Sequence, residues 1–351
     1  MIQFSIRNRY AETLSQDRQV IQAMKSRKYM ILVVISSVIR FQGQSGKSLA
    51  DEHATETKTS QTRPVADEAL LKSWLTNMVT WHQFTFKEAS DVLGIPASKV
   101  ESEAIRQRVS QAVPAPRKPG ENLMLLPYPG GRHPRIGFLE GAVDPQRETK
   151  ISAFTPWDSS SYVVVDLPEA IFSNLGLTYL AHTHIPTIFD LSKQALKPQE
   201  WIVGADGSLE LTRVLPNGIA YQAKAKATPD AIQMELSLTN GTQQKLTGLK
   251  VQQCAMLKGT KGFDAQTNSN KRFESPYAIA GNSEGTRWIV HAWSRPVRVW
   301  GNAPCPCLHS DPQFMDLNPG ETGRLVGRLW FYEGKEVDGF LAGLKNQGWE
   351  K

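Results

Sequence analysis

The sequence predicts a mainly β protein: an antiparallel β-sandwich, or a large barrel, preceded by a small block of helices. The first observation is strict alternation, because apolar Met234, Leu236 and Leu238 are separated by polar residues, as in a half-buried antiparallel strand. The second is a set of hairpin-type dipeptides between strand-like runs: Asp206-Gly207, Asn217-Gly218 and Asn240-Gly241. Third, no helical pattern between the strands is long enough for βαβ units.

Residues 1–50 are predicted to be a signal or leader segment. A basic stretch at 25–28 precedes an apolar run of 11 residues at 29–39, which is too short to cross a bilayer and typical of a signal-peptide core. Small residues at 48–50 suit cleavage after them. We therefore expect an exported protein, periplasmic or extracellular. The alternative is an uncleaved leader, which would then be the chain's contact with a membrane.

The formal net charge of +6 is concentrated in this leader. Residues 1–50 hold eight of the 40 Lys and Arg but only two of the 34 Asp and Glu, so the rest of the chain is balanced. Nucleic-acid-binding domains usually carry a basic patch. We therefore do not expect nucleic acid as a partner.

A polar stretch at 51–66 is predicted to be a flexible N-terminus, followed by a helical block at 67–113. Apolar pairs recur every four residues from Leu70, which indicates one buried helix face. Gly94 is expected to end one short helix, and two capping-box patterns are expected to open helices: Thr85…Glu88 and Ser98…Glu101. This spacing leaves DNA recognition by 98–108 as the alternative to ordinary helix packing.

A linker rich in Pro at 114–120 precedes the predicted β-sandwich domain, which spans 121–351. Further strands are expected at 161–166, 177–184, 247–257, 286–294 and 323–332. A short amphipathic helix at about 335–346 is expected to close the chain.

His182-Thr183-His184 is the sharpest local pattern for chemistry. Residues two apart on a strand point the same way, so the two imidazoles would share a face. Such a pair suits two ligands to one metal, or a general acid with an orienting partner. The structural alternative is a hydrogen-bonded histidine pair at a strand end.

Aromatic and histidine side chains concentrate at 288–311, a stretch that several prolines keep partly out of regular structure. His291 and Trp293 are expected to share one strand face. Trp300 adds a ring that suits stacking on a flat ligand. Because binding groups usually lie in such loops, we expect these three residues to contact a ligand.

Cys305, Cys307, His309 and Asp311 follow at alternate positions. In an extended chain all four would point the same way, which is a metal-binding geometry. In an exported protein Cys305 and Cys307 are instead expected to oxidise to a small strained disulfide, leaving His309 and Asp311 as a hydrogen-bonded pair. Cys254 lies in a strand-like run and is interpreted as a small buried hydrophobe.

Two further loop regions have the composition of a sugar site. One carries Arg132 and Trp157, and the other carries Asp264, Asn268 and Lys271. Planar donors and acceptors suit sugar hydroxyls, and a tryptophan ring suits the apolar face of a sugar. The alternative for any one loop is turn formation, because Asn, Asp and Gly also favour turns. Together the loops predict a carbohydrate or glycan ligand.

Several functional motifs are missing from the sequence. It has no phosphate-cradling glycine loop, no nucleotide-binding βαβ fingerprint and no Gly-x-Ser-x-Gly elbow. These absences argue against nucleotide chemistry and against a serine hydrolase.

Four segments resemble a group of uncharacterised exported bacterial proteins, through motifs such as HTHIPT and CPCLHSDPQF: 127–150, 174–190, 262–268 and 305–314. The resemblance runs from the helical block to Trp349 and implies helices before a sandwich. A looser similarity of strand order and loop style connects the chain to the galactose-mutarotase-like supersandwich, a fold common among carbohydrate-active proteins. That similarity implies a strand-borne histidine as acid, His182 or His184, and a late glutamate as base, for which no residue is matched.

The leading hypothesis is an exported β-supersandwich that binds or processes a carbohydrate. As an enzyme it would use a histidine to move a proton at an anomeric or ring carbon, with Asp264 or Asp311 as the partner. The pocket is expected to be lined by His182, His184, His291, His309, Asp311, Trp293 and the loop at 262–271.

Two other classes of function remain open. The first is a metal-dependent enzyme whose divalent metal is held by His182 and His184, joined by His291 or by His309 and Asp311. The second is a non-catalytic extracellular interaction module in which the histidines are structural.

Overall fold

The computed structural model describes residues 62–63, 65–134, 149–181, 186–194, 196 and 199–350. The predicted leader and most of the predicted flexible N-terminus lie outside these residues, so both stay predictions. Everything described belongs to one compact unit of the chain, which runs from Thr55 to Lys351. No described helix is long and apolar enough to cross a membrane.

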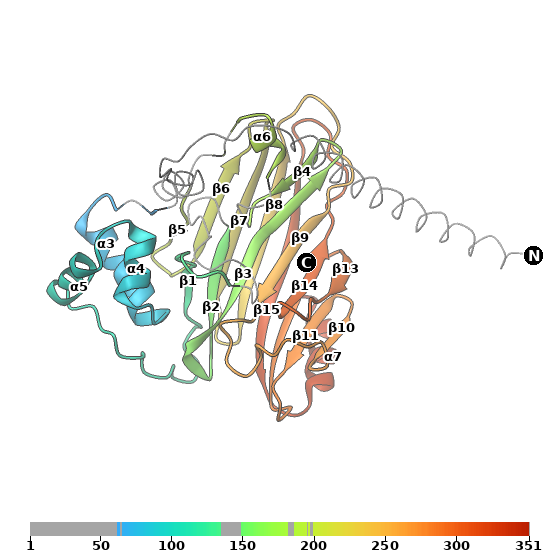
Figure 1. Cartoon of the computed structure of the whole chain (residues 1–351). Helices are drawn as coiled ribbons and strands as arrows, with labels where there is room; N and C mark the ends of the chain where they lie inside the picture. The colour runs from blue at the N-terminus through green and yellow to red at the C-terminus, as the bar shows by residue number, and fades with distance from the viewer. Residues whose placement is uncertain are drawn as a thin grey trace, which may run out of the picture. The chain divides into compact units, whose positions relative to one another are not determined.

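Two antiparallel sheets make up most of the described chain (Figure 1). Sheet A joins seven described strands in the order β1-β2-β3-β9-β14-β13, with β4 paired to β3. Its strands are β1 (Leu125–Pro127), β2 (Lys150–Thr155), β3 (Asp158–Ser173), β4 (Gly176–Tyr179), β9 (Val251–Met256), β13 (Pro296–Trp300) and β14 (Cys307–Pro312).

Sheet B joins eight described strands in the order β10-β11-β12-β15-β8-β7-β6-β5. Its strands are β5 (Ile202–Val203), β6 (Leu209–Val214), β7 (Ile219–Ala227), β8 (Ala231–Asn240), β10 (Lys271–Glu274), β11 (Tyr277–Gly281), β12 (Arg287–Trp293) and β15 (Thr322–Glu333). The predicted antiparallel β-sandwich is therefore confirmed.

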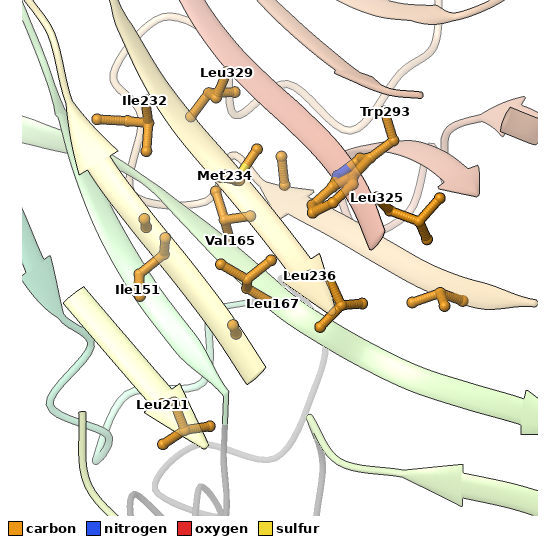
Figure 2. Close-up of a cluster of buried hydrophobic side chains, with 14 of the residues drawn as sticks. Ile151, Val165, Leu167, Leu211, Ile232, Met234, Leu236, Trp293, Leu325 and Leu329 are labelled. Atoms are coloured by element: carbon orange, nitrogen blue, oxygen red, sulfur yellow. The ribbon is translucent and has the colours of Figure 1, made fainter. Parts of the chain in front are cut away.

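The hydrophobic core lies between the two sheets. Figure 2 shows Val165 and Leu167 of sheet A beside Met234 and Leu236 of sheet B. On β8 the predicted alternation is confirmed, because the apolar positions from Ile232 to Leu238 are at most 1% exposed. Fully burying each such side chain stabilises the fold by about 1.5–3 kcal/mol.

Two of the three predicted hairpins are confirmed and one is wrong. Asp206-Gly207 joins β5 to β6, and Asn217-Gly218 joins β6 to β7. At Asn240-Gly241 the chain instead leaves β8 of sheet B and continues to β9 of sheet A. The Asn240 side chain explains the break, because its Oδ1 accepts from the Thr242 N–H at 2.9 Å and ends the ladder with a local turn.

The N-terminal block contains α3 (Glu68–Leu75), the π-helix η1 (Thr76–Trp81), α4 (Phe86–Leu93) and α5 (Ala97–Arg106). The predicted capping box from Thr85 to Glu88 is confirmed, and Gly94 ends α4 with a φ of 67°. The second predicted capping box is wrong, because α5 begins at Ala97 with Pro96 as its N-cap. The proline's fixed φ already suits a helix start, so Ser98 lies inside the helix.

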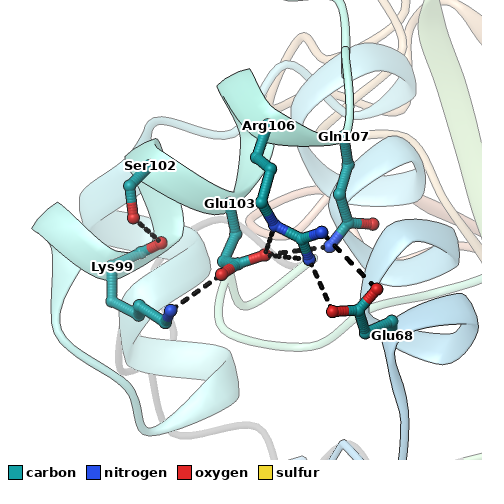
Figure 3. Close-up of polar contacts among 6 residues, drawn as sticks. All are labelled: Glu68, Lys99, Ser102, Glu103, Arg106 and Gln107. Carbon is teal, nitrogen blue, oxygen red and sulfur yellow. Dashed lines mark hydrogen bonds and ion pairs between the residues drawn. The ribbon is translucent and has the colours of Figure 1, made fainter.

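Charged side chains tie α5 to α3. Lys99 and Arg106 donate to Glu103 at 2.7 and 2.6 Å, and Arg106 also contacts Glu68 at 3.0 Å (Figure 3). These contacts lower the pKa of Glu103 to about 2, the Lys99 hydrogen bond being the largest cause. The cations of α5 therefore face carboxylates of their own block.

His82, just after η1, links the helical block to sheet A. Its Nδ1 lies 2.9 Å from the Asn77 carbonyl oxygen, and its Nε2 lies 2.7 Å from the Ser152 hydroxyl on β2. Asn77 adds a hydrogen bond of 2.9 Å to the Pro127 carbonyl. Burial lowers the pKa of His82 to about 3, although the Asn77 carbonyl opposes the shift.

His82 should therefore make the free energy of unfolding decrease as the pH is lowered. The folded chain keeps this imidazole neutral while the unfolded chain protonates it near pH 6.5, so its full contribution is present above pH 6.5 and is lost towards pH 3. Each pH unit in that window should cost about 1.4 kcal/mol. The free energy of unfolding, measured by urea titration at pH 7.5, 6 and 5, should decrease more steeply with falling pH in the wild type than in His82→Gln. Equal slopes would contradict this role.

A C-terminal helix, α7 (Val337–Gln347), covers part of the outer face of sheet B and confirms the predicted closing helix. Leu341 and Leu344 pack with Val290 of β12 and Trp330 of β15. The outer face of sheet A carries a different set of residues, which includes the buried ionisable side chains of Lys150, Asp166 and His309.

Candidate functional site

The two histidines favoured by the sequence, His182 and His184, lie outside the described residues. Before them the described chain ends at Ala181, whose N–H donates to the Glu169 carbonyl at 3.1 Å. After them Asp190 caps the short helix α6 (Ile188–Leu191) by accepting from the Thr187 N–H and hydroxyl. A metal-binding or catalytic role for the two histidines stays a prediction.

A row of polar side chains crosses sheet A on the face turned away from the core. Neighbours on the same strands, such as Ala255 and Leu308, belong to the core, so the row faces the other way. Directly opposed residues hold their Cβ atoms about 4.5–5.5 Å apart. Across β2, β3, β9, β14 and β13 the register aligns Lys150, Asp166, Cys254, His309 and Trp300.

Two thiols and an imidazole converge in this row. The ligand atoms of Cys254, Cys307 and His309 all lie within 4.8 Å of one another, and the three residues are at most 1% exposed. Cys307 precedes His309 by two positions on β14, so both side chains point to the same side. Asp166 and Glu169 form a second group with Cys254, again with ligand atoms within 4.8 Å.

Two carboxylates lie near Nδ1 of His309. Its Nδ1 lies 3.6 Å from Asp311 Oδ1 and 3.8 Å from Glu169 Oε2, slightly beyond hydrogen-bond distance. Neutral donors position both carboxylates: the Trp300 indole N–H donates to Asp311 at 2.7 Å, and the Tyr179 hydroxyl donates to Glu169 at 2.5 Å. His309 and Asp311 therefore lie close together, but a separation of 3.6 Å is too long for the predicted hydrogen bond between them.

His309 is the electrostatic centre of this group. Burial by itself lowers its pKa, but Cys254, Asp311 and Glu169 outweigh burial and raise the pKa to about 10. Strongly shifted groups of this kind concentrate at functional sites. The thiol and carboxyl groups around His309 therefore favour a positive charge at this position, either a proton on the imidazole or a metal ion bound to it.

Trp300 is not placed as an open stacking surface. The His309 ring stacks on it with a centroid distance of 4.0 Å and an interplanar angle of 14°. The Arg298 guanidinium carbon lies 4.0 Å from the same ring centroid. The predicted use of Trp300 for ligand stacking gives way to a role in covering His309 and holding Asp311.

The three cysteines of the chain form no disulfide in the structure, so the predicted bond between Cys305 and Cys307 is not present. Strand β14 begins at Cys307, which separates the two residues: Cys305 lies in the preceding loop, where the Asn302 amide contacts its sulfur at 2.9 Å. The partner of Cys307 in the cluster is Cys254, which the sequence had marked only as a small buried hydrophobe.

His291 and Trp293 do share a strand face, as predicted, but that face looks into the sandwich core. Both residues are fully buried, which does not fit the predicted ligand contact. Neither ring nitrogen of His291 has a hydrogen-bond partner among the described residues. Burial lowers the pKa of His291 to about 3. It is a neutral core residue.

Replacing His291 by leucine should therefore be nearly neutral for stability, within about 1 kcal/mol, because a buried polar group without partners gives the fold little. His82→Leu removes two good hydrogen bonds and should cost about 2–4 kcal/mol. Urea unfolding at pH 7.5 compares the two variants. A loss at His291 as large as that at His82 would contradict this assignment.

The loop at 262–271 packs beside the connection from β13 to β14. Asn268 donates to the Gly301 carbonyl at 3.3 Å, and Lys271 donates to Asn270 Oδ1 at 2.9 Å. Burial lowers the pKa of Lys271, while the nearby Cys307 opposes the shift. Lys271 therefore lies close to the group formed by Cys254, Cys307 and His309, called the thiol cluster below. Asp264, in the same loop, is exposed.

Arg132 and Trp157 serve the packing of the chain. Arg132 donates to Glu88 of α4 at 2.6 Å, which joins the helical block to the sandwich. Trp157 packs on the edge of the core and stacks on Phe263 at a centroid distance of 5.8 Å. The structure does not bring these two predicted sugar-binding residues together with the row on sheet A.

No family model matches the chain, and no curated protein matches it. Among solved structures it is similar to a putative kojibiose phosphorylase from the human microbiome, with 8% identity and a TM-score of 0.33, over 53% of this chain and 26% of that one. It is also similar to a heparan sulfate lyase mutant from Pedobacter heparinus, with 10% identity and a TM-score of 0.33, over 79% and 44%.

The Slr1438 protein from Synechocystis sp. PCC 6803 is a third similar structure, with 13% identity and a TM-score of 0.32, over 64% of this chain and 99% of that one. The chain thus spans less than half the length of the first two proteins. Likenesses this distant establish neither a family nor an activity. The β-sandwich assignment stands on the strand pairing, and the closer similarity to mutarotase-like supersandwiches stays a prediction.

Proposed function

We propose that this protein is a metal-dependent enzyme whose single divalent ion, zinc by the chemistry of its donors, is held by Cys254, Cys307 and His309. The observation that carries the proposal is the convergence of two thiols and one imidazole within 4.8 Å. Thiolate and imidazole are the ligands that zinc prefers. A tetrahedral zinc ion holds such donors about 3.5–4 Å apart, so little movement is needed to close the site.

The surroundings of His309 support this assignment. A histidine that ligates a metal through one nitrogen usually directs the other towards a carboxylate, which fixes the ring and strengthens the ligand. Asp311 Oδ1 lies 3.6 Å from Nδ1 of His309, and Trp300 holds this carboxylate in place. Nε2 is then the nitrogen for the metal.

With only three protein ligands, a bound zinc ion would have room for a water or substrate as a further ligand, as in catalytic zinc sites. A zinc ion held there would lower the pKa of a bound water towards about 7. Glu169, which shares a group with Cys254 and lies 3.8 Å from His309, would be the carboxylate that accepts the proton of such a water. The proposed reaction class is metal-assisted hydrolysis. Strand β13, the exposed edge strand beside β14, lies between the site and solvent at this edge of sheet A.

A carbohydrate remains our expected substrate class. The position of the loop at 262–271 supports this expectation, because Asn268 contacts Gly301 after β13 and Lys271 lies near Cys307. Amide and ammonium groups there suit the hydroxyls of a sugar.

Cobalt substitution tests whether the site is catalytic or purely structural. The full-length chain loaded with Co²⁺ should show thiolate-to-cobalt charge-transfer absorption, and this band should be missing in Cys254→Ser and present in Cys305→Ser. Adding azide should change the d–d bands, because an open position exchanges its ligand. A cobalt spectrum with thiolate bands that azide leaves unchanged would mean a closed structural site, and the enzyme proposal would fail.

A further inference from the structure

A cavity lies where the helical block, the linker and sheet A meet. Its volume is about 280 Å³, and it shares no lining residue with the thiol cluster. The lining residues used below come from all three parts of the fold: Trp81 from η1, Arg117 and Lys118 from the linker, and Phe154 from β2. Ligand sites are often found at such junctions between structural units.

One wall of this junction cavity is apolar and aromatic. Trp81 packs edge-on against Phe154 with a centroid distance of 5.5 Å, and Leu123 and Met124 line the cavity beside them. Trp81 is only half-buried and is the last residue of the π-helix. Such helices are rare and frequently occur at functional sites, because the wider turn redirects the side chains at its end.

The part of the lining that the linker contributes is cationic. Arg117 donates through one terminal nitrogen to the Glu121 carbonyl, but its Nε is buried and has no hydrogen-bond partner among the described residues. Lys118 adds a second positive charge. The one carboxylate in the lining, Glu121, accepts from the Lys118 backbone N–H at 3.0 Å. A guanidinium N–H without an acceptor at a cavity is a ready donor for a ligand oxygen.

The linker is held in place at both ends, so the cavity is preformed. The Ser159 hydroxyl of β3 donates to the Pro114 carbonyl at 2.5 Å, and the Leu123 N–H donates to the Thr228 carbonyl at 3.0 Å. Prolines at 114 and 116 further restrict the backbone. Binding would then not have to order this segment, which favours affinity.

We propose that this junction cavity is a binding site for a small carboxylate with an apolar, ring-sized body. The ring would lie against Trp81 and Phe154, and the carboxylate would accept from Arg117 and face Lys118. The lining carries two cations, Arg117 and Lys118, and only one carboxylate, Glu121, which disfavours a positively charged ligand. The aromatic side chains disfavour a small hydrated ion. This site is independent of the proposed metal centre.

Phenylacetate is a suitable probe because it combines an aromatic ring with a carboxylate. Titrated into the full-length chain and followed by ligand-observed NMR, it should bind with a dissociation constant of about 1 mM or lower. Phenylacetamide and acetate, which each lack one half of the chemistry, should bind at least about tenfold more weakly, since a charge-assisted hydrogen bond contributes about 1.5–3 kcal/mol.

Two variants test the wall assignments. Arg117→Gln, at a mostly solvent-facing segment, and Trp81→Leu should each weaken phenylacetate binding about tenfold or more. Arg324→Gln removes an exposed guanidinium from sheet B and should leave binding unchanged. Unchanged melting temperature in Arg117→Gln confirms that its fold is intact. Failure to bind phenylacetate at about 10 mM, or equal affinity for phenylacetamide or for Arg117→Gln, would overturn the proposal.

Discussion

Replacing Cys254 by serine is expected to abolish tight zinc binding. Cys254 belongs to both groups of converging ligand atoms, and a serine hydroxyl does not ionise to replace a thiolate. Cys307→Ser and His309→Gln should have the same effect. Asp311→Asn keeps all three ligands but weakens the support of His309, so its affinity should fall only about 10–100-fold. Competition titration with a chelator of known affinity measures all four variants.

Cys305→Ser is the matched control for these thiol variants, because Cys305 is a buried cysteine in the loop just before Cys307 but belongs to neither group of converging ligand atoms. It should bind zinc as the wild type does. At a free zinc concentration 1,000 times the dissociation constant, binding should stabilise the fold by about 4 kcal/mol. The wild type and Cys305→Ser should therefore melt at a higher temperature with zinc than with chelator. A Cys254→Ser variant that keeps wild-type affinity would contradict the ligand assignment.

Lys150→Met is expected to be the most destabilising substitution on the outer face of sheet A. Lys150 of β2 forms an ion pair with Asp166 of β3, and their side chains are 1% and 0% exposed. Removing one partner leaves the other charge buried, which typically costs about 3–5 kcal/mol. Asp166→Asn should cost a similar amount. Urea unfolding at saturating zinc measures the loss separately from any change in metal occupancy.

The double variant Lys150→Met/Asp166→Leu is the control for this ion pair. Replacing a buried ion pair by apolar groups of similar volume is often neutral, so the double variant should regain most of the stability that either single variant loses. Lys226→Met breaks an exposed pair with Asp206 and should cost no more than about 1 kcal/mol. Additive losses in the double variant would show that the charges contribute through other contacts.

Much of the fold could be predicted because its signals are local. The alternation at 232–238 and the Asp-Gly and Asn-Gly turns are periodic or dipeptide patterns, and most of them proved right. The error at Asn240-Gly241 arose because such a dipeptide indicates a turn but not which sheet the next strand joins. The start of α5 was misplaced because Pro96 and Ser98 both favour a helix start.

The candidate site was only partly predictable because its geometry depends on strand register. The spacing of Cys307, His309 and Asp311 on one strand indicated a shared face, and the structure brings them together. Cys254 and Glu169 reach the same place from other strands, 53 or more residues away along the chain from Cys307. No local pattern marks such partners. His291 misled for the converse reason, since its strand face turned out to be the core.

Elemental mass spectrometry of the full-length chain, purified without chelators or metal-affinity resin, tests the central claim most directly. The account predicts about one zinc or similar divalent ion per chain in the wild type and in Cys305→Ser, and none in Cys254→Ser. A folded wild-type chain that carries no stoichiometric metal, and takes up none on dialysis against zinc, would contradict it.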